Sequence, residues 1–375
     1  MDAARVHDAH RGGRAGPDPL GLRRGAMKRI VVDKKLLAIL AAALVLRLVA
    51  ALAIDVPSDR GEFRYVTIAA HGSPGVRGAP LYPAFLRLVY FIFGSRDNAP
   101  VPVIQALAGA LVVLPVYAAA ARLFDRPAGL VSAGVAAVYP NFALYPAAVE
   151  PEWIVVLIGA SIAAVCVIDA RESRRAALTA ALAAIGLLVQ PYFLYMIPGL
   201  FAVLKRRFVF LAALFALLAP FVVKRSIDAG RFVPVYGAHA YSLNLSVYAT
   251  GDAERILDAV YSNVNLIHLW NPAREFRIVD GVAVPFALYY IRDYSYLTVL
   301  LLGLFALVRR VRREHVAAIL PILGAVAMHM LFSGVLQFRI RALLEVALIL
   351  YLGSALRDWG IAVRSRFGGK SSKAA

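Results

Sequence analysis

The residues best suited to chemistry lie in one polar segment, residues 55–83, which reads DVPSDRGEFRYVTIAAHGSPGVRGAPLYP. Asp59 and Glu62 are three residues apart at an expected helix start, where Ser58 or Asp59 is placed to cap the helix. One interpretation is that these residues only cap the helix and that water solvates their charges. The other is a carboxylate partly desolvated beside lipid, whose raised proton affinity suits a general base acting on an acceptor hydroxyl or amine.

A second acidic candidate, Glu150, stands in the segment YPAAVEPEW with Glu152 as its close neighbour. Both residues could be first-turn acids that the helix dipole favours. Alternatively, Glu150 faces Asp59 across a helix bundle, and the two carboxylates form one acidic site.

Arginines supply the opposite charge at the start of another apolar run, FSGVLQFRIRALLEV, which contains Arg339 and Arg341. A guanidinium fork matches phosphate oxygens, so at headgroup depth this pair is a candidate phosphate site. The competing interpretation is snorkelling of the side chains to the interface. The further substrate-binding candidates are Arg77, Tyr82 and Arg225.

The composition places these residues in a membrane protein. Of 375 residues, 61% are hydrophobic and only 17% are charged, which is far more apolar than a soluble domain of this length. The net charge of +18 comes from short basic clusters between apolar runs, which favours anionic lipid over nucleic acid as the partner. The single cysteine, Cys166, permits no internal disulfide.

Apolar runs of about 20 residues predict about ten membrane-crossing helices and an all-α polytopic fold. The expected crossings are 36–54, 101–123, 128–145, 151–169, 175–189, 191–204, 208–223, 293–308, 315–333 and 340–357. Between two of them, Gln190-Pro191 marks either a tight turn or a kink in one long helix. The ionisable residues inside crossings, Arg47 and His329, are expected to be satisfied by packing and not to be catalytic.

Basic residues set the orientation, because short cytoplasmic loops carry the excess of Lys and Arg. With ten crossings the basic clusters all fall on one side, which is therefore expected to be cytoplasmic together with both termini. The outer face then carries residues 55–100, 140–150, 224–290 and 334–341. In the first outer loop, Gly61–His71 and Leu81–Phe93 are too short to span and are expected to be interfacial helices.

These assignments divide the chain into three parts. Residues 1–35 form a basic cytoplasmic N-terminus that is expected to be disordered, and residues 1–26 of it could even be a start-site artefact, since Met27 would make an ordinary start. Residues 36–357 form the transmembrane domain, with outer loops 55–100 and 224–290. Residues 358–375 form a basic cytoplasmic tail.

The order of the motifs resembles the GT-C superfamily of polytopic glycosyltransferases, which includes protein mannosyltransferases and the aminoarabinose transferase of lipid A. The residues that carry the resemblance are Leu46-Arg47, SDRGEF, APLYPAFL, FIFG, YPNFALYPAAVEPEW, KRSIDAGRFVPV and FRIRALLEV. They cover most of residues 36–357. The chain departs from the family pattern at Ser226-Ile227, Ile340, Leu343 and Val346.

The resemblance implies an enzyme that moves a sugar from a polyprenyl-phosphate carrier to an acceptor lipid, glycan or protein on the outer face of the cell membrane, with inversion. It makes Asp59 the catalytic base, with Glu62 as second choice and Glu150 as the second acidic site residue, and it assigns Arg339 and Arg341 to the lipid phosphate. A divalent metal stays open. The alternatives are a transporter or flippase of a lipid-linked solute, and a non-catalytic assembly subunit.

Overall fold

The computed structural model describes residues 33–54, 66–69, 79–94, 97–230, 232–233, 286–332 and 338–368. All of them belong to the second of the two units into which the chain divides, Met1–Val31 and Val32–Ala375. The described residues form helices joined by turns and short loops, and these ranges contain no strand. Several of the predicted site residues lie outside the described ranges: Asp59, Glu62 and Arg77.

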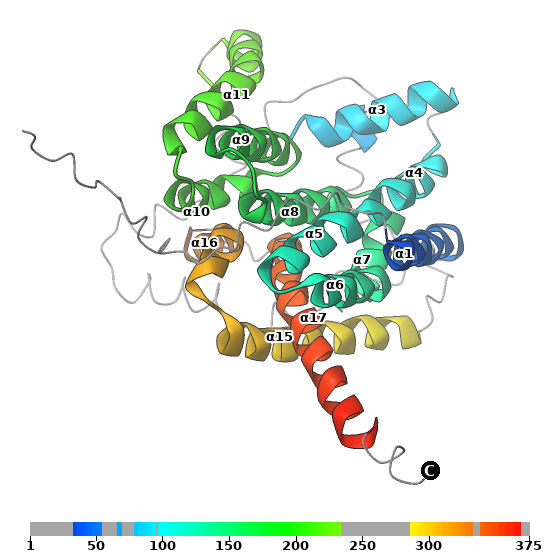
Figure 1. Ribbon diagram of the computed structural model, residues 1–375. Coiled ribbons are helices and arrows are strands. Elements are labelled where there is room, and N and C mark those ends of the chain that lie inside the picture. Colours follow the sequence, from blue (N-terminus) through cyan, green and yellow to red (C-terminus); the bar gives the residue numbers. More distant parts are fainter. Residues whose placement is uncertain are drawn as a thin grey trace, which may run out of the picture. The chain divides into compact units, whose positions relative to one another are not determined.

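Each of the ten expected apolar runs contains helix in its described residues (Figure 1). The helices are α1 (Lys34–Ala53), α3 (Leu81–Phe93), α4 (Pro100–Gly109), η1 (Ala110–Val112), α5 (Val113–Leu123), α6 (Arg126–Val138), α7 (Pro140–Leu144), η2 (Tyr145–Ala147), α8 (Glu152–Val167), α9 (Glu172–Val189), η3 (Pro191–Tyr195), α10 (Met196–Val203), α11 (Arg207–Ala229), α15 (Phe286–Arg310), η6 (Arg313–His315), α16 (Val316–Phe332) and α17 (Phe338–Gly368).

Fewer than ten of these helices meet the length and hydropathy expected of a span. Within the described residues four do so: Lys34–Ala53, Pro100–Leu123, Arg207–Asp228 and Arg341–Arg366, with a fifth if the bent pair α6 and α7–η2 counts as one. Helices α8, with 16 residues, and α10, with 8 residues, are too short to meet this criterion alone. The ten-crossing topology therefore stays a prediction.

One predicted crossing, 128–145, is not a continuous helix. The chain bends by 56° between α6 and the following α7–η2 segment. Pro140 explains the break, because it has no N–H to donate and it forces the preceding Tyr139 out of helical geometry, to ψ 120°. Gln190 is likewise extended, so Gln190-Pro191 is a turn from which η3 packs back on α9.

The last helix, α17, lies at the centre of the packing. It contacts α5, α6, α8, α15 and α16, and residues 342–352 are almost completely buried (Figure 1). Small residues let neighbouring backbones approach closely, which is how membrane helices associate. Gly353 of α17 lies against Ser132 of α6, whose hydroxyl donates to the carbonyl oxygen of Leu350 at 3.2 Å.

Large apolar side chains cover the outside of the helices. Leu52, Phe91, Phe215 and Val308 are each more than 65% exposed, a pattern that suits lipid and not water. Together with the long apolar helices, this arrangement is that of a multi-pass membrane protein.

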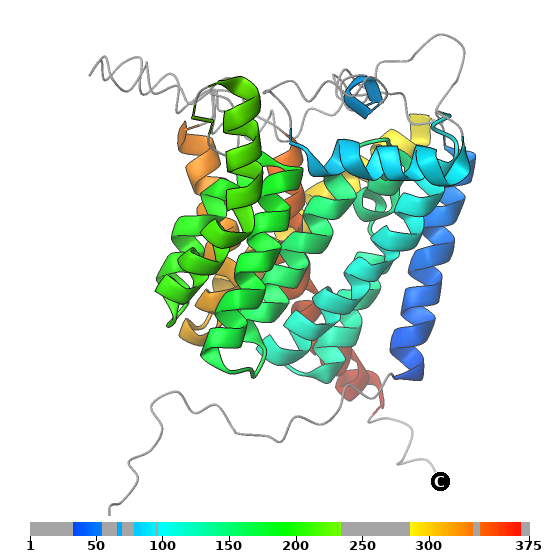
Figure 2. The same cartoon turned by 90° about the horizontal axis from the view of Figure 1, so that it is seen from above.

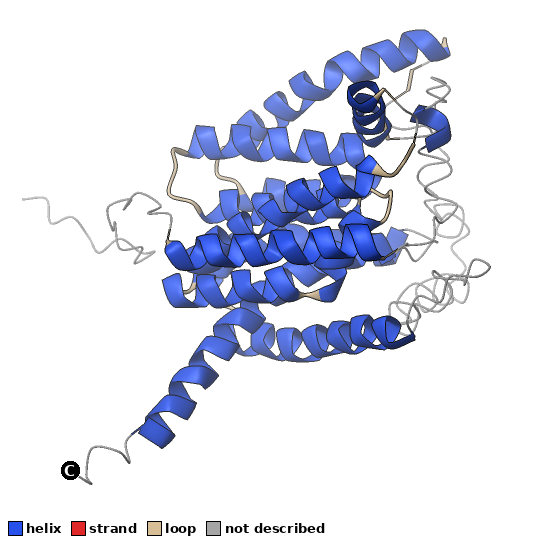
Figure 3. Ribbon diagram, turned by 90° about the vertical axis from the view of Figure 1, so that its right-hand side faces the viewer, coloured by secondary structure: helices blue, strands red, loops and turns tan. Residues whose placement is uncertain are grey.

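The two ends of the helix bundle differ in charge. At one end, ion pairs join the connections that carry the basic clusters: Arg126 with Asp33, Arg357 with Asp125, Lys205 with Glu172, and Arg310 with Asp358. Helix α3 lies across the other end (Figure 2). The described helix ends that border the undescribed segments 55–65, 234–285 and 333–337 also lie at that second end (Figure 3).

Candidate functional site

A buried carboxylate, Glu345 of α17, organises the end of the bundle where α3 lies. It is completely buried and accepts four hydrogen bonds. Its Oε1 accepts from the Tyr139 hydroxyl at 2.9 Å, from Asn141 Nδ2 at 2.6 Å and from Arg341 Nε at 2.9 Å, and its Oε2 accepts from the Tyr145 hydroxyl at 3.1 Å. Four donors fill about as many acceptor sites as a carboxylate offers, so the side chain is held firmly in place.

Arg341 is the cation of this cluster. It lies one turn before Glu345 on α17 and is 6% exposed. Its guanidinium carbon lies 3.7 Å from the centroid of the Tyr296 ring of α15, a cation–π contact. A carboxylate on one side and an aromatic face on the other thus fix the guanidinium at the beginning of α17.

The bend after α6 brings three polar donors to Glu345. Tyr139 ends α6, Asn141 lies in α7 and Tyr145 begins η2, and Asn141 also donates to the Tyr139 hydroxyl at 2.9 Å. In a straight helix over 128–145, Asn141 and Tyr145 would share one face and Tyr139 would lie on the opposite face. The break at Pro140 therefore assembles the cluster.

Arg47 of α1 donates hydrogen bonds to the backbone on the α6 side of the same bend. Its side chain is completely buried, and its guanidinium donates to the carbonyl oxygens of Ala136 and Ala137, each at 3.2 Å. These carbonyls belong to the last turn of α6, where a helix has no backbone donors of its own to offer. As expected, packing satisfies the two terminal nitrogens of Arg47, whereas its Nε has no acceptor among the described residues.

A second polar hub, Gln105 of α4, joins α3 to the bundle. Its Oε1 accepts from the Tyr82 hydroxyl at 2.7 Å and from Trp153 Nε1 at 2.9 Å. Its Nε2 donates to the carbonyl oxygens of Pro146 and Ala148, at 3.0 and 2.6 Å. Tyr82 is fully buried at this hub, so its hydroxyl holds α3 in place, and contact between Tyr82 and a substrate stays a prediction.

The acidic pair of the YPAAVEPEW segment lies close to this cluster. Glu150 lies between η2 and α8 and is 8% exposed, and Glu152 in the first turn of α8 is 1% exposed. Glu152 interacts electrostatically with Tyr145, whose hydroxyl donates to Glu345. Buried carboxylates are thus concentrated around the η2 segment.

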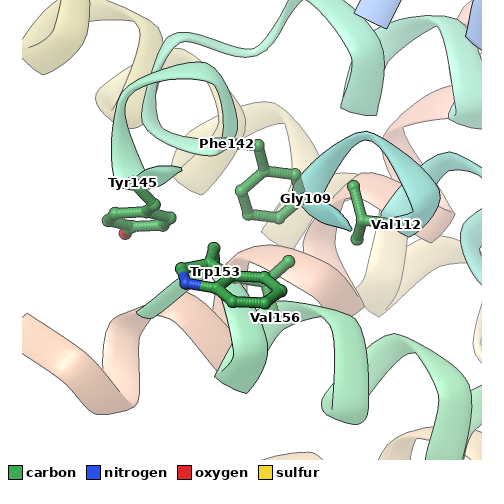
Figure 4. A pocket seen from close by; sticks show the side chains of 6 residues that line it. All are labelled: Gly109, Val112, Phe142, Tyr145, Trp153 and Val156. Carbon is green, nitrogen blue, oxygen red and sulfur yellow. The ribbon is translucent and has the colours of Figure 1, made fainter. Parts of the chain in front are cut away.

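A very small cavity of about 10 Å³ opens beside the cluster. Figure 4 shows the six side chains that line it: Gly109, Val112, Phe142, Tyr145, Trp153 and Val156. Two of them connect it to the polar groups already described, because Tyr145 donates to Glu345 and Trp153 donates to Gln105. Aromatic side chains therefore form much of the cavity wall, and hydrogen bonds to Glu345 and Gln105 hold two of them, Tyr145 and Trp153.

The structure brings together Arg341, Glu150 and Tyr82 at one end of the bundle. Arg339 begins the same helix as Arg341, although its side chain lies outside the described atoms. Arg225 lies near the end of α11, where Lys224 pairs with Asp228 at 3.1 Å. Within the described ranges, no group of three or more His, Cys, Asp or Glu residues is placed to hold a metal ion.

Sequence reasoning did not single out Glu345, Tyr139, Asn141 or Gln105. Glu345 had one available signal, because it is an acidic residue in an otherwise apolar run, four residues after an arginine, and such a pair is expected to face the protein interior. Pro140 was the signal for the bend.

Comparison with known proteins agrees with this arrangement. The family model of dolichyl-phosphate-mannose-protein mannosyltransferases matches residues 77–224. A sequence search of the curated proteins finds no significant match.

Solved structures resemble the chain over most of its length. One is ArnT from Cupriavidus metallidurans bound to undecaprenyl phosphate, with a TM-score of 0.61 and 15% identity, covering 86% of this chain and 61% of ArnT. Another is the oligosaccharyltransferase of Archaeoglobus fulgidus tethered with an acceptor peptide, with a TM-score of 0.57 and 12% identity, covering 91% and 51%. A third is the archaeal oligosaccharyltransferase AglB from Archaeoglobus fulgidus in complex with an inhibitory peptide and a dolichol-phosphate, with a TM-score of 0.51 and 13% identity, covering 92% and 53%.

The likeness shows that this chain shares the helical fold of ArnT and of the archaeal oligosaccharyltransferase AglB. The family model covers less than half of the chain, and the solved structures are at most 15% identical to it, so the comparisons show a shared fold. The chain spans about three fifths of the length of ArnT and about half that of the archaeal enzyme.

Proposed function

We propose that this chain is a glycosyltransferase that moves a sugar from a polyprenyl-phosphate-linked donor to an acceptor on the outer face of the membrane. The observation that carries this proposal is the buried guanidinium of Arg341, held between Glu345 and the Tyr296 ring at the beginning of α17. A fixed guanidinium at the end of an apolar bundle suits the phosphate of a lipid carrier. The GT-C fold supports the same reaction class.

In this reaction Asp59 accepts the proton of the acceptor hydroxyl or amine as the acceptor attacks the anomeric carbon. The bond between that carbon and the phosphate oxygen breaks, and the polyprenyl phosphate leaves with inversion at the sugar. Arg341 and Arg339 meet the charge that develops on the phosphate. Glu150 is the second carboxylate, and Glu62 takes the base role if Asp59 does not.

The proposed sidedness follows from the two ends of the bundle. The end joined by basic ion pairs is assigned to the cytoplasm, in line with the positive-inside pattern. The end with Arg341, where α1 leads into the segment that contains Asp59, is assigned to the outer face.

The test is sugar transfer from a polyprenyl-phosphate monosaccharide in purified membranes, comparing the wild type with Asp59→Asn. We expect the variant to lose at least 100-fold in rate, since a positioned base contributes about 10²–10⁴-fold. Asp97→Asn is the matched control, because Asp97 is exposed in the connection between α3 and α4. Full activity in Asp59→Asn would remove Asp59 from the mechanism, and movement of the lipid-linked donor across the membrane without transfer would favour a flippase.

A further inference from the structure

We propose that Glu345 is a positioning residue that sets the guanidinium of Arg341 to receive the donor phosphate, an inference that rests on the function proposed above. Glu345 is completely buried, so its carboxylate is shielded from solvent by the groups that surround it. It therefore acts through Arg341 and not on the substrate.

The geometry of the Arg341–Glu345 pair indicates that Glu345 orients the guanidinium and does not merely neutralise its charge. Glu345 accepts from Arg341 through Nε, the guanidinium nitrogen nearest the side-chain stem. A bond at that nitrogen sets the plane of the fork, and the paired terminal nitrogens are the ones that fit a phosphate side by side. The Tyr296 ring, 3.7 Å from the guanidinium carbon, limits movement out of that plane.

Glu345 can orient Arg341 because other groups orient Glu345. Tyr139, Asn141 and Tyr145 donate to it from the bent segment after α6, which is anchored in turn by Arg47. Outer partners of this kind fix a binding side chain in metal sites too, and their loss there costs about 10–100-fold in affinity.

A carboxylate beside an arginine also competes with the phosphate for the positive charge. Three hydrogen bonds from Tyr139, Asn141 and Tyr145 already disperse the charge of Glu345, which weakens that competition. Without Glu345, the plane of the buried guanidinium would no longer be fixed. Phosphate binding would then have to order that side chain, which costs free energy. We therefore expect weaker binding when Glu345 is neutralised, although its removal increases the local positive charge.

The experiment measures the affinity of the purified full-length protein for undecaprenyl phosphate, used here as the probe. Glu345→Gln, Arg341→Gln and the double variant are compared with the wild type, and thermal unfolding is followed in parallel. Glu172→Gln is the matched control, because Glu172 also pairs with cations, Arg175 and Lys205, but at the opposite end of the bundle.

We expect each single variant in the cluster to raise the dissociation constant about tenfold. The double variant should bind no more weakly than Arg341→Gln alone, because Glu345 acts through Arg341. Glu172→Gln should bind as the wild type does. A purely structural role for Glu345 would lower the unfolding temperature without changing the affinity of the folded protein, and that result would overturn the inference.

Other outcomes are equally decisive. Tighter binding by Glu345→Gln would show that Glu345 does not position Arg341. The same conclusion would follow if the increase in dissociation constant of the double variant equalled the product of the two single increases. If Arg341→Gln binds as the wild type does, the proposed phosphate site itself fails. If Glu345→Gln does not fold, Glu345→Asp keeps the charge but shortens the reach, and it should weaken binding in the same direction.

Discussion

The guanidinium of Arg47 in α1 donates a 3.2 Å hydrogen bond to the carbonyl oxygen of Ala137 in α6. The first helix of the bundle thereby caps the broken end of another helix, 90 residues further along the chain. In an apolar setting, carbonyls left without such a donor cost free energy.

Replacing Arg47 by methionine keeps an unbranched apolar stem but removes the donors to Ala136 and Ala137. We expect the free energy of unfolding to fall by about 2–4 kcal/mol, because buried carbonyls lose their partners. Thermal unfolding in detergent measures this. Arg174→Met, at an exposed position of α9, is the control and should stay within about 0.5 kcal/mol of the wild type. Equal effects in both variants would contradict the capping role.

Two glycines of α17 should respond in opposite ways to the same substitution. A Cβ at Gly353 would lie 2.6 Å from the Ser132 Cα of α6, whereas nothing lies within 4 Å of a Cβ at Gly360. We expect Gly353→Ala to destabilise by about 1–3 kcal/mol through overpacking. Gly360→Ala should stabilise by up to about 1 kcal/mol through helix propensity. Comparable unfolding temperatures for the two variants would show that α6 and α17 do not pack this closely.

Stability should depend on pH through His315. This residue lies between α15 and α16; its Nδ1 is 3.0 Å from the Tyr351 hydroxyl and its Nε2 is 3.1 Å from the carbonyl oxygen of Leu123. Burial lowers its pKa below the ordinary 6.5, an effect that the neighbouring Glu314 opposes. The unfolded chain then binds more protons than the folded chain, so this contribution to stability is fully present above about pH 6.5 and is lost as the pH falls through the lower folded-state pKa.

The measurement is the unfolding temperature between pH 8 and 5 for the wild type and for His315→Gln. The wild type should lose stability as the pH falls through this range. The variant has no imidazole to titrate and should show a flatter profile. Parallel profiles would assign the pH dependence to other groups.

Replacing Gln105 should lower the free energy of unfolding more than replacing any one of its hydrogen-bond partners does. Replacing it by leucine leaves the Tyr82 hydroxyl, the Trp153 Nε1 and two carbonyl oxygens without their partner. We expect a loss of about 2–4 kcal/mol, against about 1 kcal/mol for Tyr82→Phe, which removes one hydrogen bond. Thermal unfolding compares them, and Trp153 fluorescence reports the local change. A larger loss in Tyr82→Phe would argue against a shared hub.

The sequence predicted the helices well because long apolar runs leave few alternatives in a membrane. It also predicted that Arg47 is satisfied internally, because a charge in such a run must face the protein. It did not predict what Arg47 contacts, since Ala136 and Ala137 offer only backbone carbonyls, and backbone acceptors carry no residue-type signal.

The candidate site was predicted in part. Arg341 and Glu150 stood out because charged residues beside apolar runs are conspicuous. Gln105, Tyr139 and Asn141 did not, because ordinary polar residues acquire a role only through neighbours that are distant in the chain. Glu345 pairs with residues about 200 positions earlier, and no local spacing encodes that separation.

The anchoring of the bent segment also has a consequence for how the protein is made. Arg47 holds the segment from a helix synthesised early, whereas Glu345 arrives only with the last helix. Until α17 has been inserted, Tyr139, Asn141 and Tyr145 lack the acceptor that they share in the folded protein. The site therefore cannot form before α17 has been inserted, and nascent chains stalled before α17 would expose unsatisfied polar groups to membrane proteases.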